Sequence, residues 1–260
     1  MTSASSALRL TLSLARRDLT AQGEGSILGP AWLLLQPLLF FGLVYGVFTY
    51  GLRVNNVADE PFVLWFMVGY IPWVYFASCL TDMTLVVRNY SYLLPHPNIE
   101  PAFLPMVKLI SHSLVHAIFL AAVVFFAVTQ GVKLTPAIGG VLVYFSLMVA
   151  LLLGLGWIIA SISVFSKDLS NLVLLISQFG FWLTPIFWDI SQLPERARWL
   201  AQLNPMYHIV AGYRRSFFNY DYGQPEVLND GLLLAAIIVL LVAGFSIFRR
   251  LQAHFIEVLN

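Results

Sequence analysis

Six long apolar stretches divide the chain, and each contains almost no charged residue. A helix that crosses a bilayer needs about 17 to 25 such residues, and in lipid every backbone polar group must be paired within its own segment. The pattern predicts an all-α membrane protein with six transmembrane helices. We expect the spans at residues 30–51, 61–84, 102–130, 136–165, 168–188 and 231–249.

Composition supports this interpretation, because 59% of the 260 residues are hydrophobic and only 10% are charged. The spans and their connections use nearly the whole chain, so we expect a single transmembrane domain over residues 1–260, with no cleaved signal peptide. A net charge of +1 gives no bulk attraction for a polyanion, and we expect no nucleic-acid partner. The single cysteine, Cys79, excludes an intramolecular disulfide.

The distribution of basic residues predicts the orientation. With six spans both chain ends share one side, and the short flanks on that side carry Arg9, Arg16, Arg17, Arg88, Lys108, Lys167, Arg249 and Arg250. The opposite short loops hold Arg53 and Lys133, and the segment 189–230 adds four arginines. The excess places both termini in the cytoplasm.

Residues 6–22 have the pattern of an amphipathic helix that lies in the membrane interface. Leu8, Leu12, Ala15 and Leu19 share one face of this helix. A second face groups Arg9, Arg16 and Arg17 with Ser13 and Thr20, so we expect the cationic face to contact lipid head groups. The alternative is a frayed polar tail.

The connection at residues 88–101 is too apolar for a solvated loop, yet its prolines forbid one continuous helix. We expect a short cytoplasmic helix that offers aromatic and aliphatic side chains to another protein. Its candidate contact residues are Asn89, Tyr90, Tyr92, Leu93 and Leu94. The alternative is a loop packed against its own bundle.

The segment 190–220 predicts two short helices that enter the outer leaflet and return. Residues 193–203 are amphipathic, and Asn204-Pro205 is a strong helix start. A helix from Pro205 to about Phe218 is roughly 21 Å long, too short to cross. It carries the candidate outer-gate residues Tyr207, Tyr213, Arg214 and Arg215.

Two spans carry stripes that indicate contact with protein or water rather than lipid. In the fifth span, Ser170, Ser177 and Thr184 repeat every seven residues beside Asn171 and Gln178, with Phe181 and Trp182 next to them. In the first span one face holds Trp32, Gln36, Leu43, Val47 and Tyr50, while Gly42, Gly46 and Thr49 form a small-residue face.

Rings combined with neutral hydrogen-bonding groups suit sugars, so two copies of the chain could enclose a glycan path between these spans. The candidate path residues are Trp32, Gln36, Tyr50, Asn171, Gln178, Phe181 and Trp182. The alternative for each stripe is ordinary helix–helix packing.

No catalytic constellation is present. His112 and His116 have the spacing of two metal ligands, but no acidic residue or cysteine accompanies them on that face, so we expect no metal. The phosphate-binding pattern G-x-x-x-x-G-K-[ST] is absent, which predicts that the chain does not hydrolyse ATP by itself.

An ordered set of motifs covers nearly the whole chain: Arg17-Asp18, Leu28-Gly29-Pro30-Ala31-Trp32, Gln36-Pro37, Lys167-Asp168-Leu169, Thr184-Pro185-Ile186, Asn204-Pro205-Met206 and Tyr213-Arg214. By these motifs the chain resembles the transmembrane subunits of ABC-type polysaccharide exporters, which export O-antigen, capsule and teichoic acid. It departs from that family at Gln22-Gly23-Glu24, where basic and aromatic residues are usual.

The resemblance implies a homodimer in the bacterial cytoplasmic (inner) membrane, bound to two copies of a separate ATPase subunit. ATP and magnesium would bind that partner, and this chain would need no cofactor. It also implies an interfacial N-terminal helix, a coupling helix between spans two and three, outer gate helices after span five, and a glycan substrate that is lipid-linked. The alternatives are a related permease for drugs or small lipids and, more remotely, a membrane-embedded transferase.

Overall fold

The computed structural model of the chain describes residues 4–21, 26–57, 60–96, 99–133, 135–218 and 226–259. The helices are α1 (Ala4–Ala21), α2 (Trp32–Gly46), α3 (Phe62–Met83), α4 (Val86–Asn89), α5 (Leu104–Thr129), α6 (Gly140–Ser163), α7 (Asp168–Leu183), α8 (Glu195–Gln202), α9 (Pro205–Phe218), α10 (Glu226–Leu251) and α11 (Phe255–Leu259). Two short strands, β1 (Asn56–Val57) and β2 (Glu60–Pro61), pair antiparallel with Asn56 opposite Pro61.

Five stretches of helix within the described ranges are long and apolar enough to cross a membrane, which confirms an all-α membrane protein. They are Gly29–Gly51, which joins α2 to a 3-10 turn and a π-helical turn, Phe62–Met83, Pro101–Thr129, Pro136–Ser163 and Leu233–Leu259. The predicted span 168–188 contains the apolar helix α7, which has only 16 residues. It stops at Leu183 because Thr184 adopts extended backbone angles and Pro185 has no N–H.

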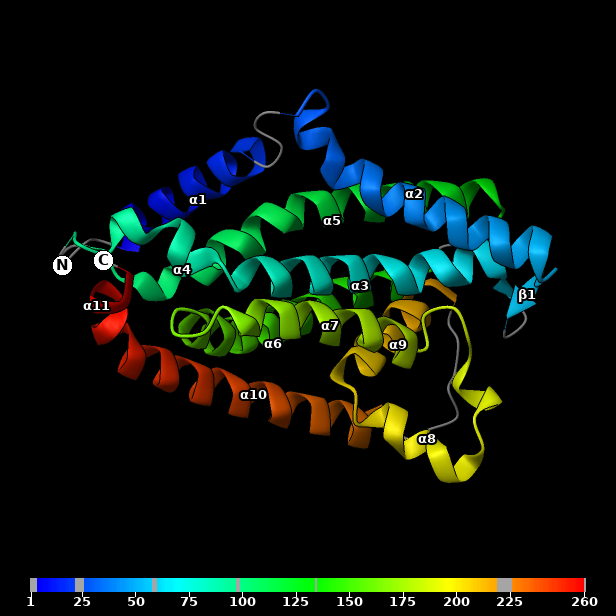
Figure 1. The fold of residues 1–260 in the computed structure, drawn as a ribbon. Helices are drawn as coiled ribbons and strands as arrows, with labels where there is room; N and C mark the ends of the chain where they lie inside the picture. The colour runs from blue at the N-terminus through cyan, green and yellow to red at the C-terminus, as the bar shows by residue number, and fades with distance from the viewer. Residues whose placement is uncertain are drawn as a thin grey trace.

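The long helices run roughly along one axis, and α3 lies at their centre (Figure 1). Most of α3 is buried. In its most apolar 18-residue part, 72% of the residues lie inside the molecule, compared with 6% in the corresponding part of Gly29–Gly51. Its side chains Trp65 and Phe66 are fully enclosed, and the Cys79 thiol is buried as well. The first predicted span is therefore a peripheral helix of this subunit, and the second is its core.

The helices α6 and α10 approach each other at two glycines. A Cβ atom built on Gly244 would lie 2.3 Å from the carbonyl oxygen of Gly154, and one built on Gly154 would lie 2.8 Å from the backbone of Leu240. Such backbone contact gives van der Waals and close polar interactions that larger residues would prevent. These two glycines thus allow the backbones of α10 and α6 to pack directly against each other.

The predicted helix from Pro205 to about Phe218 is confirmed as α9. The Asn204 side chain accepts a hydrogen bond from the Met206 amide at 3.0 Å, which is the N-cap that the sequence indicates. The helix fits closely against α6, since a Cβ atom on Gly212 would lie 2.3 Å from the Tyr144 ring. This helix is too short to cross a bilayer, and protein surrounds it. The unpaired backbone groups at its ends can therefore find partners that lipid would not offer.

One end of the molecule gathers α4, α11 and the beginning of α1, while α8 and the β-hairpin lie at the other (Figure 1). At the first end the buried residues Val86, Leu104, Phe248 and Phe255 form a second hydrophobic cluster. This cluster ties the segment after α3 to the C-terminal helices. Two segments singled out in the sequence lie outside the described residues. They are Gln22-Gly23-Glu24, where the chain departs from the family that it resembles, and Pro97-Asn98 in the 88–101 connection.

Replacing Gly244 by valine is expected to destabilise the subunit. The new side chain would overlap the Gly154 carbonyl, so α10 must move away from α6, at a cost of about 1 to 3 kcal/mol. A lower midpoint of thermal unfolding in detergent is the measurement. Gly139→Ala is the control, because no atom lies within 4 Å of its Cβ position. Equal unfolding midpoints for the two variants would contradict this contact.

Candidate functional site

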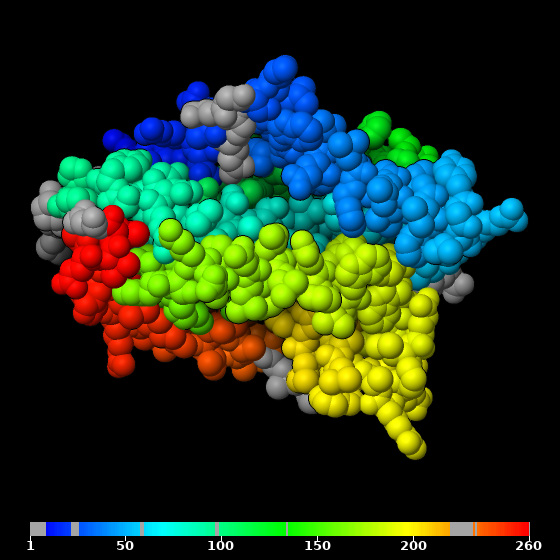
Figure 2. Space-filling view, viewed as in Figure 1, coloured from blue at the N-terminus to red at the C-terminus, as the bar shows by residue number. Residues whose placement is uncertain are grey.

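The two helices predicted to border a path both reach the surface on one face of the molecule. In Figure 2, α7 runs across the middle of this face and α2 lies above it, with α3 between them. On the α2 side, Trp32, Gln36 and Tyr50 are exposed, Tyr50 to 75%. Leu43 and Val47, from the same predicted stripe, are exposed too. We call this surface the α2–α7 face.

The polar residues of α7 divide between two sides rather than sharing one. Val173, Ser177 and Phe181 point into the subunit and are buried. Asn171, Gln178 and Trp182 form a separate exposed line, with Trp182 58% exposed. The expectation that the polar groups of this span form one stripe was wrong, because adjacent positions such as Ser177 and Gln178 are about 100° apart around a helix and face different sides.

An aromatic cluster joins the two helices within one subunit. The ring centroid of Phe181 on α7 lies 5.4 Å from that of Phe40 on α2 and 6.3 Å from that of Tyr70 on α3. Trp182 packs on Phe181 and Phe187 at 5.5 and 5.1 Å. Phe181, a predicted path residue, is therefore buried in this conformation, and it supports Trp182 from behind.

Three of the four predicted outer-gate residues lie inside the subunit. Tyr207 and Tyr213 are buried, and Arg214 has no exposed surface. The Tyr213 hydroxyl forms a 3.0 Å hydrogen bond with His116 Nε2 on α5. Arg215 is half-buried, with its guanidinium 5.4 Å from the centre of the Tyr144 ring. An outer mouth lined by these side chains is not what the structure shows.

Arg214 holds the chain where α7 ends. Its Nη1 donates to the carbonyl of Pro185 at 2.7 Å, and its Nη2 donates to that of Ile186 at 2.5 Å. The guanidinium lies 3.7 Å from the centre of the Trp65 ring. A planar, always charged group is suited to bind two carbonyls and stack on a ring at once. Arg214, a predicted outer-gate residue, therefore binds backbone carbonyls inside the subunit in this conformation.

The connection after α3 offers some of its predicted contact residues and buries others. Asn89 is exposed and Tyr92 is 50% exposed, whereas Tyr90 and Leu93 are buried and Leu94 is half-buried. The alternative of a segment packed against its own bundle holds for one side, and the other side is exposed. Arg88 fixes it to α6 by donating hydrogen bonds to the carbonyls of Ser163 and Val164, the latter at 2.9 Å.

The interfacial helix contacts the bundle through a face that the sequence did not indicate. Thr11, Leu14, Ala15 and Asp18 are buried against α5, while Arg9, Arg16 and Arg17 are exposed, and Leu12 is exposed as well. The cationic side is thus free to meet lipid head groups. The buried side includes a carboxylate.

That carboxylate belongs to an ionic network that sequence reasoning missed. Lys108 Nζ on α5 lies 2.5 Å from Asp18 Oδ1 and 3.7 Å from Asp82 Oδ2 on α3, and His112 Nε2 lies 2.9 Å from the same Asp82 oxygen. A lysine in an apolar run needs a buried partner, and Asp18 on the helical face of Ala15 was the available signal.

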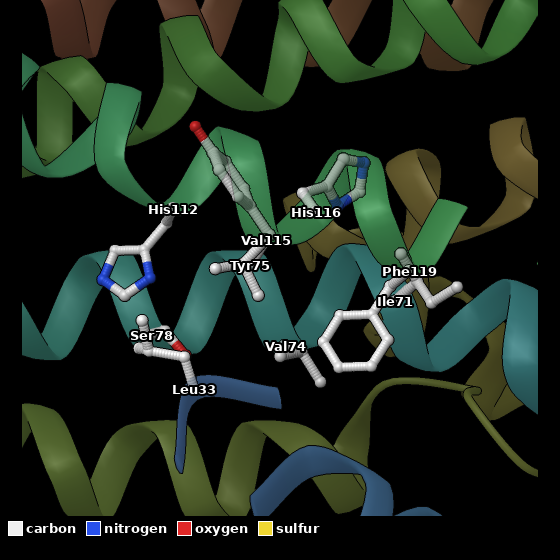
Figure 3. A pocket seen from close by; sticks show the side chains of 9 residues that line it. All are labelled: Leu33, Ile71, Val74, Tyr75, Ser78, His112, Val115, His116 and Phe119. Carbon is white, nitrogen blue, oxygen red and sulfur yellow. The ribbon is translucent and has the colours of Figure 1, made fainter. Parts of the chain in front are cut away.

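The two histidines of α5 serve different neighbours, His112 in the ionic network and His116 at Tyr213. Both line a cavity of about 30 Å³ between α2, α3 and α5, with the ring of Tyr75 beside them (Figure 3). Ser78 adds a hydroxyl to its wall. The space suffices for about one water molecule and is far too small for a sugar ring.

Comparison with known proteins identifies relatives along nearly the whole chain. The family model described as ABC-2 type transporter matches residues 9–218. An O-antigen export system permease protein RfbA from Myxococcus xanthus is 28% identical over 250 residues, which cover 95% of this chain and 94% of that protein. RfbA from Klebsiella pneumoniae is 24% identical over 253 residues, 96% and 95% of the two chains. The capsule polysaccharide export inner-membrane protein CtrC from Neisseria meningitidis serogroup A is 24% identical over 238 residues, 91% and 88%.

Removing the Arg214 guanidinium is expected to destabilise the protein. In Arg214→Met, two buried carbonyls lose their donors, each at a cost of about 1 to 3 kcal/mol. Lysine at this position should not restore stability, because it cannot bind both carbonyls while stacking on Trp65. Thermal unfolding compares these variants with Arg215→Met, which removes a half-exposed neighbour. If Arg214→Met were as stable as Arg215→Met, the two hydrogen bonds from Arg214 to backbone carbonyls would not stabilise the fold.

Proposed function

Because the chain belongs to the ABC-2 type transporter family, we propose that it is the transmembrane subunit of an ATP-driven exporter of polysaccharide. The observation that carries this proposal is the end-to-end match to proteins named as O-antigen and capsule polysaccharide export permeases. An O-antigen or capsule glycan, attached to a lipid, is the substrate class that these relatives favour. The chain would act in the bacterial inner membrane.

In this proposal two copies of the chain form the path, with their α2–α7 faces turned toward each other. The exposed indole of Trp182 and the exposed amides of Asn171 and Gln178 supply the stacking and hydrogen-bonding groups that a neutral glycan needs. Gly42 and Gly46 on α2 have no atom within 4 Å of their Cβ positions, so this side of α2 is open to a partner helix. The homodimer would bury both surfaces.

The energy would come from two copies of a separate ATPase subunit, which bind ATP and magnesium, while this chain carries no cofactor. Asn89 and Tyr92 are the exposed groups that such a partner could contact, and Leu94 lies beside them. The exposed Arg9, Arg16 and Arg17 lie on the same helix as Asp18 and suit the anionic head groups of the cytoplasmic leaflet. We therefore assign this end of the molecule, with both termini, to the cytoplasm.

At the opposite end, α8 and α9 would form the outer gate, and α7 would be the fifth of six spans. Asn204, between α8 and α9, joins this helix pair to the end of α7 by donating a 2.8 Å hydrogen bond from Nδ2 to Thr184 Oγ1. In this arrangement the buried side chains of Tyr207, Tyr213 and Arg214 hold α9 in the closed state of the gate. The half-buried Arg215 would meet an emerging anionic sugar. Opening would have to move α9 as a unit.

The alternative of a permease for drugs or small lipids shares this architecture and predicts that the exposed side chains of α7 serve only packing. A membrane-embedded transferase would need clustered acids and histidines. Among the described residues the closest such group is the network of Asp18, Asp82 and His112, whose carboxylates are bound by Lys108 and His112. The cavity beside His112 is too small for a substrate. The exporter is the better account.

Replacing Trp182 by alanine is expected to lower glycan export about tenfold while leaving ATP hydrolysis within about twofold. The substitution removes a stacking surface, which contributes about 0.5 to 1.5 kcal/mol per ring contact, and the glycan meets it repeatedly. Export is measured in vesicles that contain the subunit and its ATPase. Phe125→Ala is the control, because Phe125 is 72% exposed on α5 away from this face. Normal export by the Trp182 variant would favour the packing alternative.

Cysteines introduced at 171, 178 and 182 should react with a membrane-impermeant thiol reagent more rapidly when ATP binds the complex, since water must fill an opening path. A cysteine at 125 should remain unreactive in the bilayer. If all four positions stayed unreactive in an actively exporting complex, the α2–α7 face would not be the path. If the complex hydrolysed ATP and moved no glycan, the substrate assignment would be wrong.

A further inference from the structure

The segment proposed to meet the ATPase is tied to the interfacial helix by one side-chain hydrogen bond. The Tyr90 hydroxyl donates to Asp18 Oδ1 at 3.3 Å. Burial, and then the negative charge of Asp18, raise the pKa of Tyr90, so its hydroxyl keeps its proton and remains a donor. Tyr90 itself is buried, but its neighbours Asn89 and Tyr92 are exposed. The inward side of the segment therefore rests on a carboxylate of α1.

The same oxygen of Asp18 accepts from Lys108 at 2.5 Å. Only 8% of Asp18 and 5% of Lys108 is exposed. An ion pair so enclosed is much less screened by solvent than a surface pair. Ser111 adds a 3.2 Å hydrogen bond to the Ala15 carbonyl one turn along both helices. Lys108 thus fixes α1, and through Asp18 it fixes Tyr90, with respect to the membrane-crossing helix α5.

We propose that Asp18 and Lys108 are positioning residues for the segment 89–94, and that this ion pair transmits the movement of the segment to α5. The proposal rests on the function proposed above. A push on the exposed side of the segment would reach α5 through Tyr90, Asp18 and Lys108.

A second carboxylate allows the pair to separate without leaving a buried ammonium alone. Asp82 on the central helix α3 lies 3.7 Å from Lys108 and also binds His112. When α1 moves outward, Lys108 can exchange Asp18 for Asp82. A buried cation with two acceptors on different helices has two stable arrangements, which is what a transmitting contact requires. The network would then alternate between holding α1 and holding α3.

A merely structural role predicts a different result from a positioning role. If the pair only stabilises the fold, its loss lowers the amount of folded complex but leaves each remaining complex fully competent. If the pair transmits movement, the remaining complexes hydrolyse ATP while moving less glycan. The quantity that separates the roles is therefore the glycan moved per ATP hydrolysed.

The variants are Tyr90→Phe, which keeps the ring and removes only the hydroxyl, and Asp18→Asn, which keeps the shape and removes the charge. The control is Glu257→Gln, the same carboxyl-to-amide change on an exposed residue of α11 at the same end of the molecule. All are reconstituted with the ATPase partner in vesicles. We expect glycan moved per ATP to fall about fivefold in Tyr90→Phe, the effect of one lost hydrogen bond, and further in Asp18→Asn. Glu257→Gln should equal the wild type.

Ratios equal to that of Glu257→Gln in both variants would overturn the proposal, even if their thermal stability fell. A wild-type complex that hydrolyses ATP and moves no glycan would instead refute the proposed function. In that case stimulation of the ATPase by the permease becomes the readout. Loss of stimulation in Tyr90→Phe and Asp18→Asn, but not in Glu257→Gln, would still support the positioning role, and unchanged stimulation would overturn it.

Discussion

Backbone carbonyls that lose their helical partners within an apolar bundle must be paired by other groups, and two arginines meet this requirement. Arg88 donates to the carbonyls at the end of α6, and Arg214 donates to those just past the end of α7. Both guanidinium groups come from segments that are distant in the chain. The same contacts that satisfy the backbone therefore attach the segment after α3 and the helix α9 to the transmembrane helices.

The distribution of burial divides the subunit into a core and an open face. The central helix α3 is enclosed by α5, α6, α7 and α9. The stretch Gly29–Gly51 is peripheral and contacts the bundle through rings that include Phe40, Phe41 and Phe48. Lys108 and His112 of α5 lie toward the end that holds α4, and the buried Arg214 of α9 lies toward the other end. Between them the exposed side of α7 presents amides and an indole. The subunit thus combines an enclosed core with an exposed face.

Much of this organisation follows from the sequence. Long apolar runs predicted the membrane class, Asn204 and Pro205 predicted the start of α9, and the family motifs predicted the relatives. The sequence could not show which side of α7 faces inward, because Ser177 and Asn171 are equally polar and only the packing of Phe181 decides. Nor could it show that Arg214 binds carbonyls instead of sugars. The partners of Arg214 are backbone atoms, which have no sequence signature, and the Asp18–Lys108 pair joins residues 90 positions apart.

The shortness of α7 has a consequence for the surrounding bilayer. A helix of 16 residues is about 24 Å long, whereas the hydrocarbon layer is about 30 Å thick. If α7 crosses the bilayer as proposed, lipids beside its exposed side would compress or tilt to match it, at a fraction of a kcal/mol per ångström. A second subunit placed against this side would replace those deformed lipids with protein. Membrane thickness would then influence how strongly two copies associate, independently of any contact between their side chains.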